Sequence, residues 1–363
     1  MEAINYFSST YNEARKKFLD AAHRSNAQIE NIKHPLDDQN GEPLYTDIAV
    51  IGSSDAKNSL VLISGLHGVE SFTGSAIQTG FLHDEIASSL APDISVLFIH
   101  AINPYGFAHL RRFNEDNIDL NYNFSDHSKP SPKNPGYEKL ADAIAPKSVS
   151  FWPEIVSWSR LLCYMIIKGE KELEIAITGG QYTHPKGLFY GGRFETWSNR
   201  TIREITHRYL SNKNRVVVID FHTGLGGFGN AEIILNVPEE SNIYKRAIAI
   251  WGSERVKTTV TGKALGTQLT WSLKLAFQKM LPNTEITAVS LEYGTFPPMK
   301  VFKALRLENW LHHYCEENHP KAQKIKAELL KVFYPNTEDW KLQVWQQGKE
   351  IVDQALLSIN PSQ

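Results

Sequence analysis

The sequence holds only two cysteines, Cys163 and Cys315, which lie far apart and outside any CxxC pattern. This scarcity excludes a cysteine-rich zinc module and argues against a disulfide scaffold, so a reducing compartment fits. The chain also lacks a strong excess of either charge, because 38 basic residues stand against 40 acidic ones. No general affinity for nucleic acid or anionic lipid is therefore expected, and small or neutral partners are the better expectation.

Long hydrophobic runs are missing as well. The most apolar stretch, LLCYMIIKG at 161–169, is too short to cross a bilayer, and the N-terminus has no basic segment followed by an apolar one. We therefore expect a soluble, cytoplasmic protein without a membrane partner. Two catalytic signatures are also absent. The chain has no GxSxG nucleophile elbow, which sets a serine hydrolase aside, and no His-Glu dipeptide, which excludes an HExxH zinc peptidase.

Short apolar runs alternate with longer segments of helical period, a pattern typical of an α/β fold. Strands are predicted at 60–64, 94–100, 215–221, 231–237 and 285–293. Helices are predicted at about 4–29, 72–87, 154–176, 195–211, 241–252, 267–279, 299–316 and 321–333. We predict one domain over 1–363, with a mixed, twisted sheet flanked by helices on both faces. A surface insertion around 125–195 and a helical C-terminal segment at 299–363 complete it.

A histidine and a glutamate stand three residues apart where a predicted strand ends, in LVLISGLHGVES at 60–71. Ligands and catalytic groups gather at the carboxyl edge of an open α/β sheet, where loops converge on a crevice. Gly65 and Gly68 allow a tight turn, so His67 and Glu70 can face a common point. Zinc in a catalytic site takes three protein ligands plus water, so a third ligand is needed from another strand end.

The segment RVVVIDFHTGLGG offers that ligand, because His222 follows an apolar strand and precedes a glycine-rich loop. His67, Glu70 and His222 would leave about +1 formal charge on a bound zinc ion. Such an ion polarises a carbonyl and lowers the pKa of bound water toward ~7. The alternative for each residue is a structural role at a strand end, since an HxxE spacing also arises by chance.

Four motifs then occur in a fixed order over about 52–296, namely GLHGVES, INPYGFAHLRRFNEDNIDLNYNF, DFHTG and SLEYGTF. In order and approximate spacing they resemble the zinc carboxypeptidase family of metallopeptidases, with its HxxE, NPDG, RxN, DxNRN, late His and later Glu. The likeness is greatest to a poorly characterised bacterial branch, and the succinylglutamate desuccinylase and aspartoacylase group is more distantly similar. The resemblance implies a zinc-carboxypeptidase-like fold and makes His67, Glu70 and His222 the ligands of one zinc ion.

The same resemblance gives roles to other residues. Glu292 matches the general base, and its place at the end of an apolar strand independently favours a raised pKa. Arg112 matches the arginine that stabilises the oxyanion, because Asn121 is the ninth residue after it, and Arg111 is the less suitable choice. Asn121 matches the substrate-orienting asparagine. The arginine that follows it in the family is Tyr122 here, which cannot grip a terminal carboxylate with a bidentate ion pair.

A glycine- and aromatic-rich segment, GGQYTHPKGLFYGGRF at 179–194, is the last candidate. It could line a substrate pocket, with Tyr182 as a binding residue, or it could be a well-packed connection. Asp220 and His184 remain open as ligands of a second metal ion.

The predicted function is a zinc-dependent hydrolase of amide bonds, a carboxypeptidase-like metallopeptidase with a peptide substrate. Two alternatives stay open, an N-acyl amino acid deacylase and a pseudo-enzyme that binds metal without turnover. A structural metal site requires neither Glu292 nor Arg112, and the presence of both disfavours the pseudo-enzyme. The sequence leaves the number of subunits undetermined.

Overall fold

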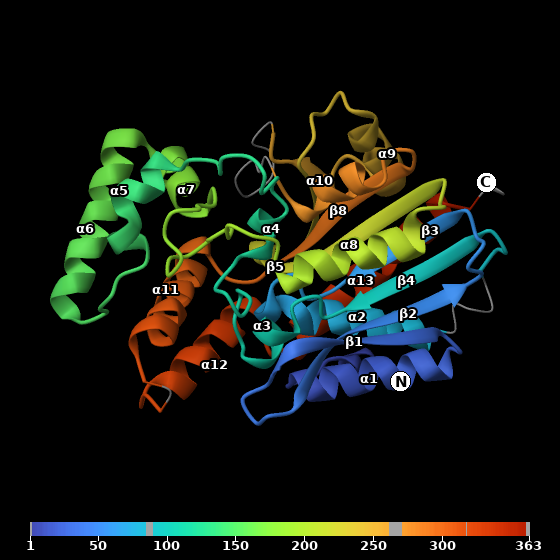
Figure 1. The fold of residues 1–363 in the computed structure, drawn as a ribbon, viewed down its shortest axis with the longest axis horizontal. Coiled ribbons are helices and arrows are strands. Elements are labelled where there is room, and N and C mark those ends of the chain that lie inside the picture. The colour runs from blue at the N-terminus through green and yellow to red at the C-terminus, as the bar shows by residue number, and fades with distance from the viewer. Residues whose placement is uncertain (1, 85–89, 261–270, 317, 361–363) are drawn as a thin grey trace.

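A mixed β-sheet forms the centre of the molecule (Figure 1). The structure is a computed structural model that describes residues 2–84, 90–260, 271–316 and 318–360. Within this part of the chain the sheet has eight strands in the order β1-β2-β4-β3-β5-β8-β6-β7. They are β1 (Gln28–Asp37), β2 (Pro43–Gly52), β3 (Asn58–Ile63), β4 (Ile94–His100), β5 (Arg215–Phe228), β6 (Ala231–Leu235), β7 (Val256–Thr258) and β8 (Glu285–Gly294).

The central strands β4, β3, β5 and β8 are parallel, whereas β1 and β2 are antiparallel to their neighbours and β6 is antiparallel to β8. Parallel strands are buried on both faces, which explains their nearly continuous apolar sequences. Leu60 and Leu62 of β3 point to one face, and Val61 and Ile63 point to the other. The predicted α/β fold with a mixed sheet is confirmed.

Helices cover both faces of this sheet (Figure 1). The face that includes Leu60 packs against α1 (Tyr11–Arg24), α2 (Ser71–His83), α9 (Asn242–Trp251) and α13 (Glu338–Ser358). The opposite face packs against α8 (Trp197–Leu210) and α10 (Leu273–Met280). Short helical turns complete the loops, namely η1 (Ala3–Tyr6), η2 (Gly68–Glu70), α3 (Pro104–Ala108) and α4 (Leu120–Asn123).

A third apolar cluster lies beyond one end of the sheet. It joins α5 (Pro135–Ile144), α6 (Phe151–Lys168), α7 (Glu170–Thr178), α11 (Pro298–Tyr314) and α12 (Ala322–Phe333). The first three of these helices fall within the predicted insertion around 125–195, and α11, α12 and α13 fall within the predicted helical segment 299–363. No helix of the described residues is long and apolar enough to span a membrane.

Several predicted elements differ from the structure. The helix predicted at 4–29 ends at Arg24, and the strand β1 begins at Gln28. The helix predicted at 154–176 is two helices, because Gly169 at φ +94° breaks the chain between α6 and α7. The prediction at 267–279 is confirmed only over α10, since 261–270 lie outside the described residues. The strands β1, β2 and β7 and the helix α5 were not predicted, and α13 was predicted only as part of the helical segment 299–363.

A buried ion network connects α11 and α12 to the loop after α3. The Glu308 Oε1 atom accepts hydrogen bonds from Arg111 Nε and Lys326 Nζ, each at 2.8 Å, and the Glu308 side chain is fully buried. Burial alone would raise the pKa of Glu308, but the two cations lower it to about 2. Arg111 also donates a hydrogen bond to Asn117 Oδ1 at 2.8 Å, so its side chain is committed to this network.

We predict that Glu308→Gln lowers the free energy of unfolding by about 3–5 kcal/mol, because it leaves the Arg111 guanidinium buried without a counter-charge. Urea unfolding at neutral pH measures the loss. In the parent, this stabilisation is present above the pKa of an unfolded glutamate, about 4.3, and is lost as the pH falls toward 2. The difference in the free energy of unfolding between the parent and Glu308→Gln should therefore become smaller as the pH falls from about 4.3 toward 2.

The matched control is Asp20→Asn, which breaks the exposed Lys16–Asp20 pair. This variant should lose less than about 1 kcal/mol of the free energy of unfolding, since exposed ion pairs contribute little to stability. Equal losses in the two variants would contradict a special role for the buried network.

Candidate metal centre

The turn after β3 carries His67 and Glu70, and two neighbouring segments fix its shape. Gly68 N and Val69 N donate hydrogen bonds to Arg112 O and Arg111 O, at 3.2 and 2.8 Å. A Cβ atom on Gly68 would lie 1.9 Å from the backbone carbon of Gly106, so only glycine fits here. The GLHG turn, the NPYG turn and the two arginines are thus packed backbone against backbone.

Strand register places the next two residues. His222 of β5 is paired with Glu292 of β8 in the parallel ladder, so both side chains lie on the same face of the sheet. Glu292 Oε1 accepts a hydrogen bond of 3.0 Å from Leu225 N, in the glycine-rich stretch of β5. The strands that carry His222 and Glu292 are therefore adjacent in the sheet.

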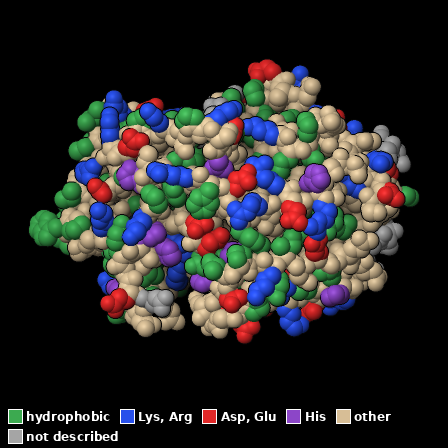
Figure 2. All heavy atoms as spheres, in the orientation of Figure 1, with side chains coloured by type: hydrophobic (Ala, Val, Ile, Leu, Met, Phe, Trp, Pro, Cys, Tyr) green, Lys and Arg blue, Asp and Glu red, His purple; other side chains and the backbone are tan. Residues whose placement is uncertain are grey.

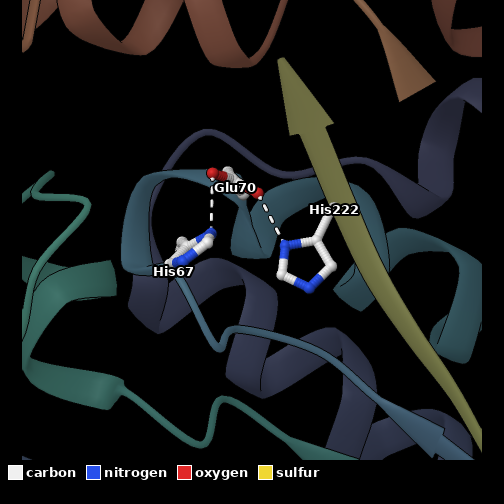
Figure 3. Close-up of side chains that lie close together, drawn as sticks. All are labelled: His67, Glu70 and His222. Carbon is white, nitrogen blue, oxygen red and sulfur yellow. Dashed lines mark hydrogen bonds and ion pairs between the residues drawn. The ribbon is translucent and has the colours of Figure 1, made fainter. Parts of the chain in front are cut away.

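The three predicted ligands come together at one point (Figure 3). His67 Nδ1 lies 3.0 Å from Glu70 Oε1, and His222 Nδ1 lies 3.1 Å from Glu70 Oε2. Each residue offers one ligand atom, and these atoms lie within 4.8 Å of one another. All three side chains are buried. In the described part of the chain, this is the one group of three or more His, Cys, Asp or Glu that could hold a metal ion.

Two further carboxylates orient the imidazole rings. His67 Nε2 lies 3.0 Å from Asp119 Oδ1, and His222 Nε2 lies 2.7 Å from Asp220 Oδ2. Burial would raise the pKa of Asp119, but Arg112 and His67 lower it to about 2, so the group is an acceptor. The Nε2 atoms therefore carry hydrogen, and in the neutral rings both Nδ1 atoms are left as donors to a metal.

The residues present fit a divalent cation. Glu70, Asp119 and Asp220 oppose one guanidinium, that of Arg112, which gives a formal charge of −2 when the imidazoles are neutral. His67 Nδ1 is buried and makes no hydrogen bond, although Glu70 is close. Burial lowers the pKa of His222, but the carboxylates of Asp220 and Glu70 raise it to about 10. These carboxylates thus favour a positive charge on the imidazole, and a metal ion at Nδ1 would take the place of a proton.

Arg112 reaches into this pocket. Its Nη1 donates to Glu70 Oε1 at 2.5 Å, and its Nε donates to Asp119 Oδ2 at 3.1 Å. Arg112 Nη2 and Asn121 Nδ2 lie 3.1 and 3.2 Å from His67 Nε2. Because that nitrogen already donates to Asp119, it cannot accept from either group. Hydrogens of Arg112 and Asn121 consequently remain for an oxygen of a bound substrate.

Glu292 has the electrostatic environment of a proton acceptor. It is buried, and desolvation together with the nearby Glu70 charge raises the pKa of Glu292 to about 7. A carboxylate with a pKa near the working pH can both take up and release a proton.

Tyr122 and Tyr182 lie beside the centre, and their hydroxyl groups have backbone partners. Tyr122 donates to Thr178 O at the end of α7, and Tyr182 donates to Tyr122 O at 2.7 Å. The Tyr122 ring packs so closely on Gly180 that a Cβ there would lie 2.3 Å from it. These contacts are structural, and the predicted roles of the two tyrosines in substrate binding stay predictions.

From the sequence, one residue of the centre has no predicted role, and the role of another stays open. Asp119 orients His67, and its signal was present as the first letter of DLNYNF. Asp220 was left open as a second-metal ligand, but its Oδ2 atom is bonded to His222. His184 is bonded to Thr183 and is not in the metal-binding group. A separate Ser75–His100–Asp47 array is buried in the core, and its histidine and aspartate are 3.9 Å apart, so it offers no accessible nucleophile.

Comparison with known proteins gives one decisive match, since residues 7–347 match the family described as "Protein of unknown function (DUF2817)". The chain belongs to the DUF2817 family. No curated protein matches this DUF2817 chain.

Several solved structures are similar to it. One is bovine thrombin-activatable fibrinolysis inhibitor in complex with tick carboxypeptidase inhibitor, at 11% identity and a TM-score of 0.48, covering 96% of this chain and 98% of that one. Another is a metallo-carboxypeptidase from Burkholderia cenocepacia, at 11% identity and a TM-score of 0.47, and the match covers 98% of this chain and 70% of that one. A third is an aspartoacylase family protein from Mesorhizobium loti, at 12% identity and a TM-score of 0.39, and the match covers 78% of this chain and 66% of that one. Both groups that the sequence resembles are thus represented, and similarity at this level carries no statement about activity.

We predict that the purified protein binds about one zinc ion per chain and that Asp220→Asn weakens zinc affinity about 10–100-fold. The amide cannot supply the negative charge that orients His222 and makes it a better ligand. Competition with a chelating dye measures the affinity, and His222→Ala should abolish binding.

His184→Ala is the control, since this residue lies outside the metal-binding group. It should bind zinc as the parent does. An unchanged affinity in Asp220→Asn would remove Asp220 from the metal centre.

Proposed function

We propose that this protein is a zinc-dependent hydrolase of amide bonds, with a peptide-like substrate. One observation carries the proposal. Two imidazole Nδ1 atoms face the two oxygens of one buried carboxylate, while Glu292, with its pKa raised to about 7, stands beside His222 in the strand register. A structural metal site gains nothing from a neighbouring carboxylate of that kind, whereas hydrolysis requires one.

His67, Glu70 and His222 would hold the metal, and Asp119 and Asp220 would keep both imidazoles oriented. When bound, zinc supplies Lewis acidity that polarises a carbonyl and makes water more acidic. Glu292 accepts the proton of the attacking water and returns it to the nitrogen of the leaving amine. Its hydrogen bond from Leu225 N fixes the carboxylate for both transfers.

Arg112 and Asn121 supply the remaining interactions. Arg112 Nη2 and Asn121 Nδ2 have hydrogens that His67 cannot accept, and both lie next to the proposed ligands. A fixed guanidinium at this place stabilises the negative charge that develops on the carbonyl oxygen, and the amide orients the substrate. In the structure Arg112 also neutralises Glu70, so its position depends on the charge of the centre.

We expect Glu292→Gln to lower kcat by about 10²–10⁴-fold, because glutamine cannot accept the proton. Zinc content and KM should stay close to the parent values, which separates loss of the base from loss of the metal. Glu285→Gln is the matched control, because Glu285 is at the opposite end of β8 and pairs with Arg215 on the surface. Parent-like turnover in Glu292→Gln would remove this residue from the mechanism.

The pH dependence of the parent gives an independent measurement. The base acts when deprotonated, so kcat/KM should fall as the pH drops through the pKa of Glu292, about 7. A cation next to Glu70 favours the ionised form, which places this acid limb at or below that value. The limb should vanish from the residual activity of Glu292→Gln. An identical acid limb in that variant would assign it to another group.

The alternative substrates are N-acyl amino acids, which carry a free carboxylate as a peptide C-terminus does. Tyr122 stands where the resembled carboxypeptidases have an arginine, and its hydroxyl is bonded to the backbone of α7. A buried tyrosine in this position cannot form an ion pair with a terminal carboxylate. The substrate class is therefore set by other contacts, and a strict requirement for a free C-terminus is not expected. A cytoplasmic location likewise stays a prediction.

We predict that paired substrates with a free or an amidated terminal carboxylate are hydrolysed with kcat/KM values within about tenfold of each other. A site with a cation that pairs with the terminal carboxylate would reject the amidated substrate far more strongly. Peptides and N-acyl amino acids in both forms make up the test panel. A preference for the free acid of about 10⁴-fold would show that another cation takes the place of the arginine.

A further inference from the structure

The helix α6 presents an apolar face to solvent. Of the 13 large hydrophobic side chains that are exposed in the described residues, seven lie on this helix of 18 residues. They are Phe151, Trp152, Ile155, Val156, Leu162, Ile166 and Ile167, which are between 44% and 75% exposed. The helix stands at the left edge of the molecule, far from the sheet, and hydrophobic side chains gather at that edge (Figures 1 and 2). We call these seven residues, with Ser159 and Cys163, the α6 stripe.

The α6 stripe is continuous along one side of the helix. Its members recur at spacings of three and four residues, so they share one face, and none of them is charged. Ser157 and Leu161, the two buried residues of α6, lie on the opposite side. Most surface helices turn their broader apolar face toward the core, whereas α6 turns it toward solvent.

The exposed area matches what one partner contributes to a stable protein interface. Seven side chains of this size and exposure present on the order of 800 Å² of apolar surface. This is about the area that each partner buries in a standard interface, and it exceeds the largest apolar patch of a typical monomer.

The charges around the stripe disfavour a lipid surface. Residues 135–178, which span α5, α6 and α7, contain six acidic and five basic residues, a formal net charge of −1. Helices that lie in a membrane interface are rich in lysine and arginine, which attract anionic lipid. A protein partner with an uncharged, apolar face is the better complement.

The order of residues in the stripe identifies that partner as a second copy of the chain. The positions 151, 152, 155 and 156 mirror 167, 166, 163 and 162 about Ser159. In an antiparallel pair of α6 helices with a twofold axis at Ser159, each apolar residue therefore meets an apolar residue or Cys163. The small serine at the centre permits a close approach, and the helix dipoles oppose each other favourably.

We propose that the protein is a twofold symmetric dimer in solution, joined by antiparallel packing of the α6 stripe. A groove of about 690 Å³ between α6 and α11 continues the stripe, and it is lined by Trp158, Leu162 and Leu307 among others. Side chains of the second copy fill this groove from the opposite helix.

Sedimentation equilibrium of the full chain across the micromolar range tests the proposal. The parent should have twice the chain mass of 41.1 kDa. Trp152→Glu and Ile166→Glu, which place a charge at paired positions, should raise the dissociation constant about 100-fold or more. Leu357→Glu is the control, since Leu357 is also exposed (53%) but lies on α13, and this variant should remain a dimer.

Disulfide trapping tests the orientation. In a Cys315→Ser background, Ile155→Cys faces Cys163 of the second copy, and oxidation by diamide should link the two chains. The two residues are too far apart on one helix to bond within a chain. A parent that links more readily through Cys163 alone would overturn the antiparallel arrangement.

Three results would overturn the proposal as a whole. One is a monomeric parent throughout the concentration range. Another is dimerisation that both glutamate variants retain. The third is a monomer that floats with phosphatidylcholine and phosphatidylserine vesicles, which would assign the stripe to a lipid surface.

Discussion

The buried carboxylate of Glu70 is the group on which the rest of the centre depends. Burial would raise the pKa of Glu70, yet His67 and Arg112 hold it well below its ordinary value. Its two oxygens are contacted from three segments of the chain, the turn after β3, the middle of β5 and the loop that follows α3. Thr223 N, also in β5, donates a hydrogen bond to Glu70 Oε2. A buried carboxylate that water cannot reach is stable only when cations or hydrogen-bond donors contact it. The fold must therefore bring these three segments together.

Sheet topology meets this requirement with few constraints. Because β3 and β5 are adjacent and parallel, the turn after β3 and the part of β5 just beyond its pairing with β3 meet at one edge of the sheet. The neighbouring β8 adds Glu292 in register with His222. This explains why the ligands and the base could be predicted from short motifs at strand ends. Each motif is local in sequence, and a parallel sheet alone is enough to bring such ends to one edge.

The parts that the sequence did not predict lack such a local signal. The edge strand β1 contains charged and polar residues and alternates imperfectly, so the apolar run that marked the central strands is absent from it. The orienting role of Asp119 depends on a contact with His67, 52 residues away, which no spacing rule provides. The break between α6 and α7 depends on the left-handed conformation of Gly169, whereas the flanking residues alone favour a continuous helix.

The segment formed by α5, α6 and α7 connects two properties of the molecule. At its end, the carbonyl of Thr178 accepts a hydrogen bond from the Tyr122 hydroxyl, and Gly180 packs on the ring, so this segment determines where the Tyr122 side chain points. The same segment exposes the α6 stripe at its far side. An arginine at position 122 would need solvent or a substrate carboxylate in place of that carbonyl and glycine. These helices thus fix an uncharged side chain beside the centre and carry an apolar surface beyond it.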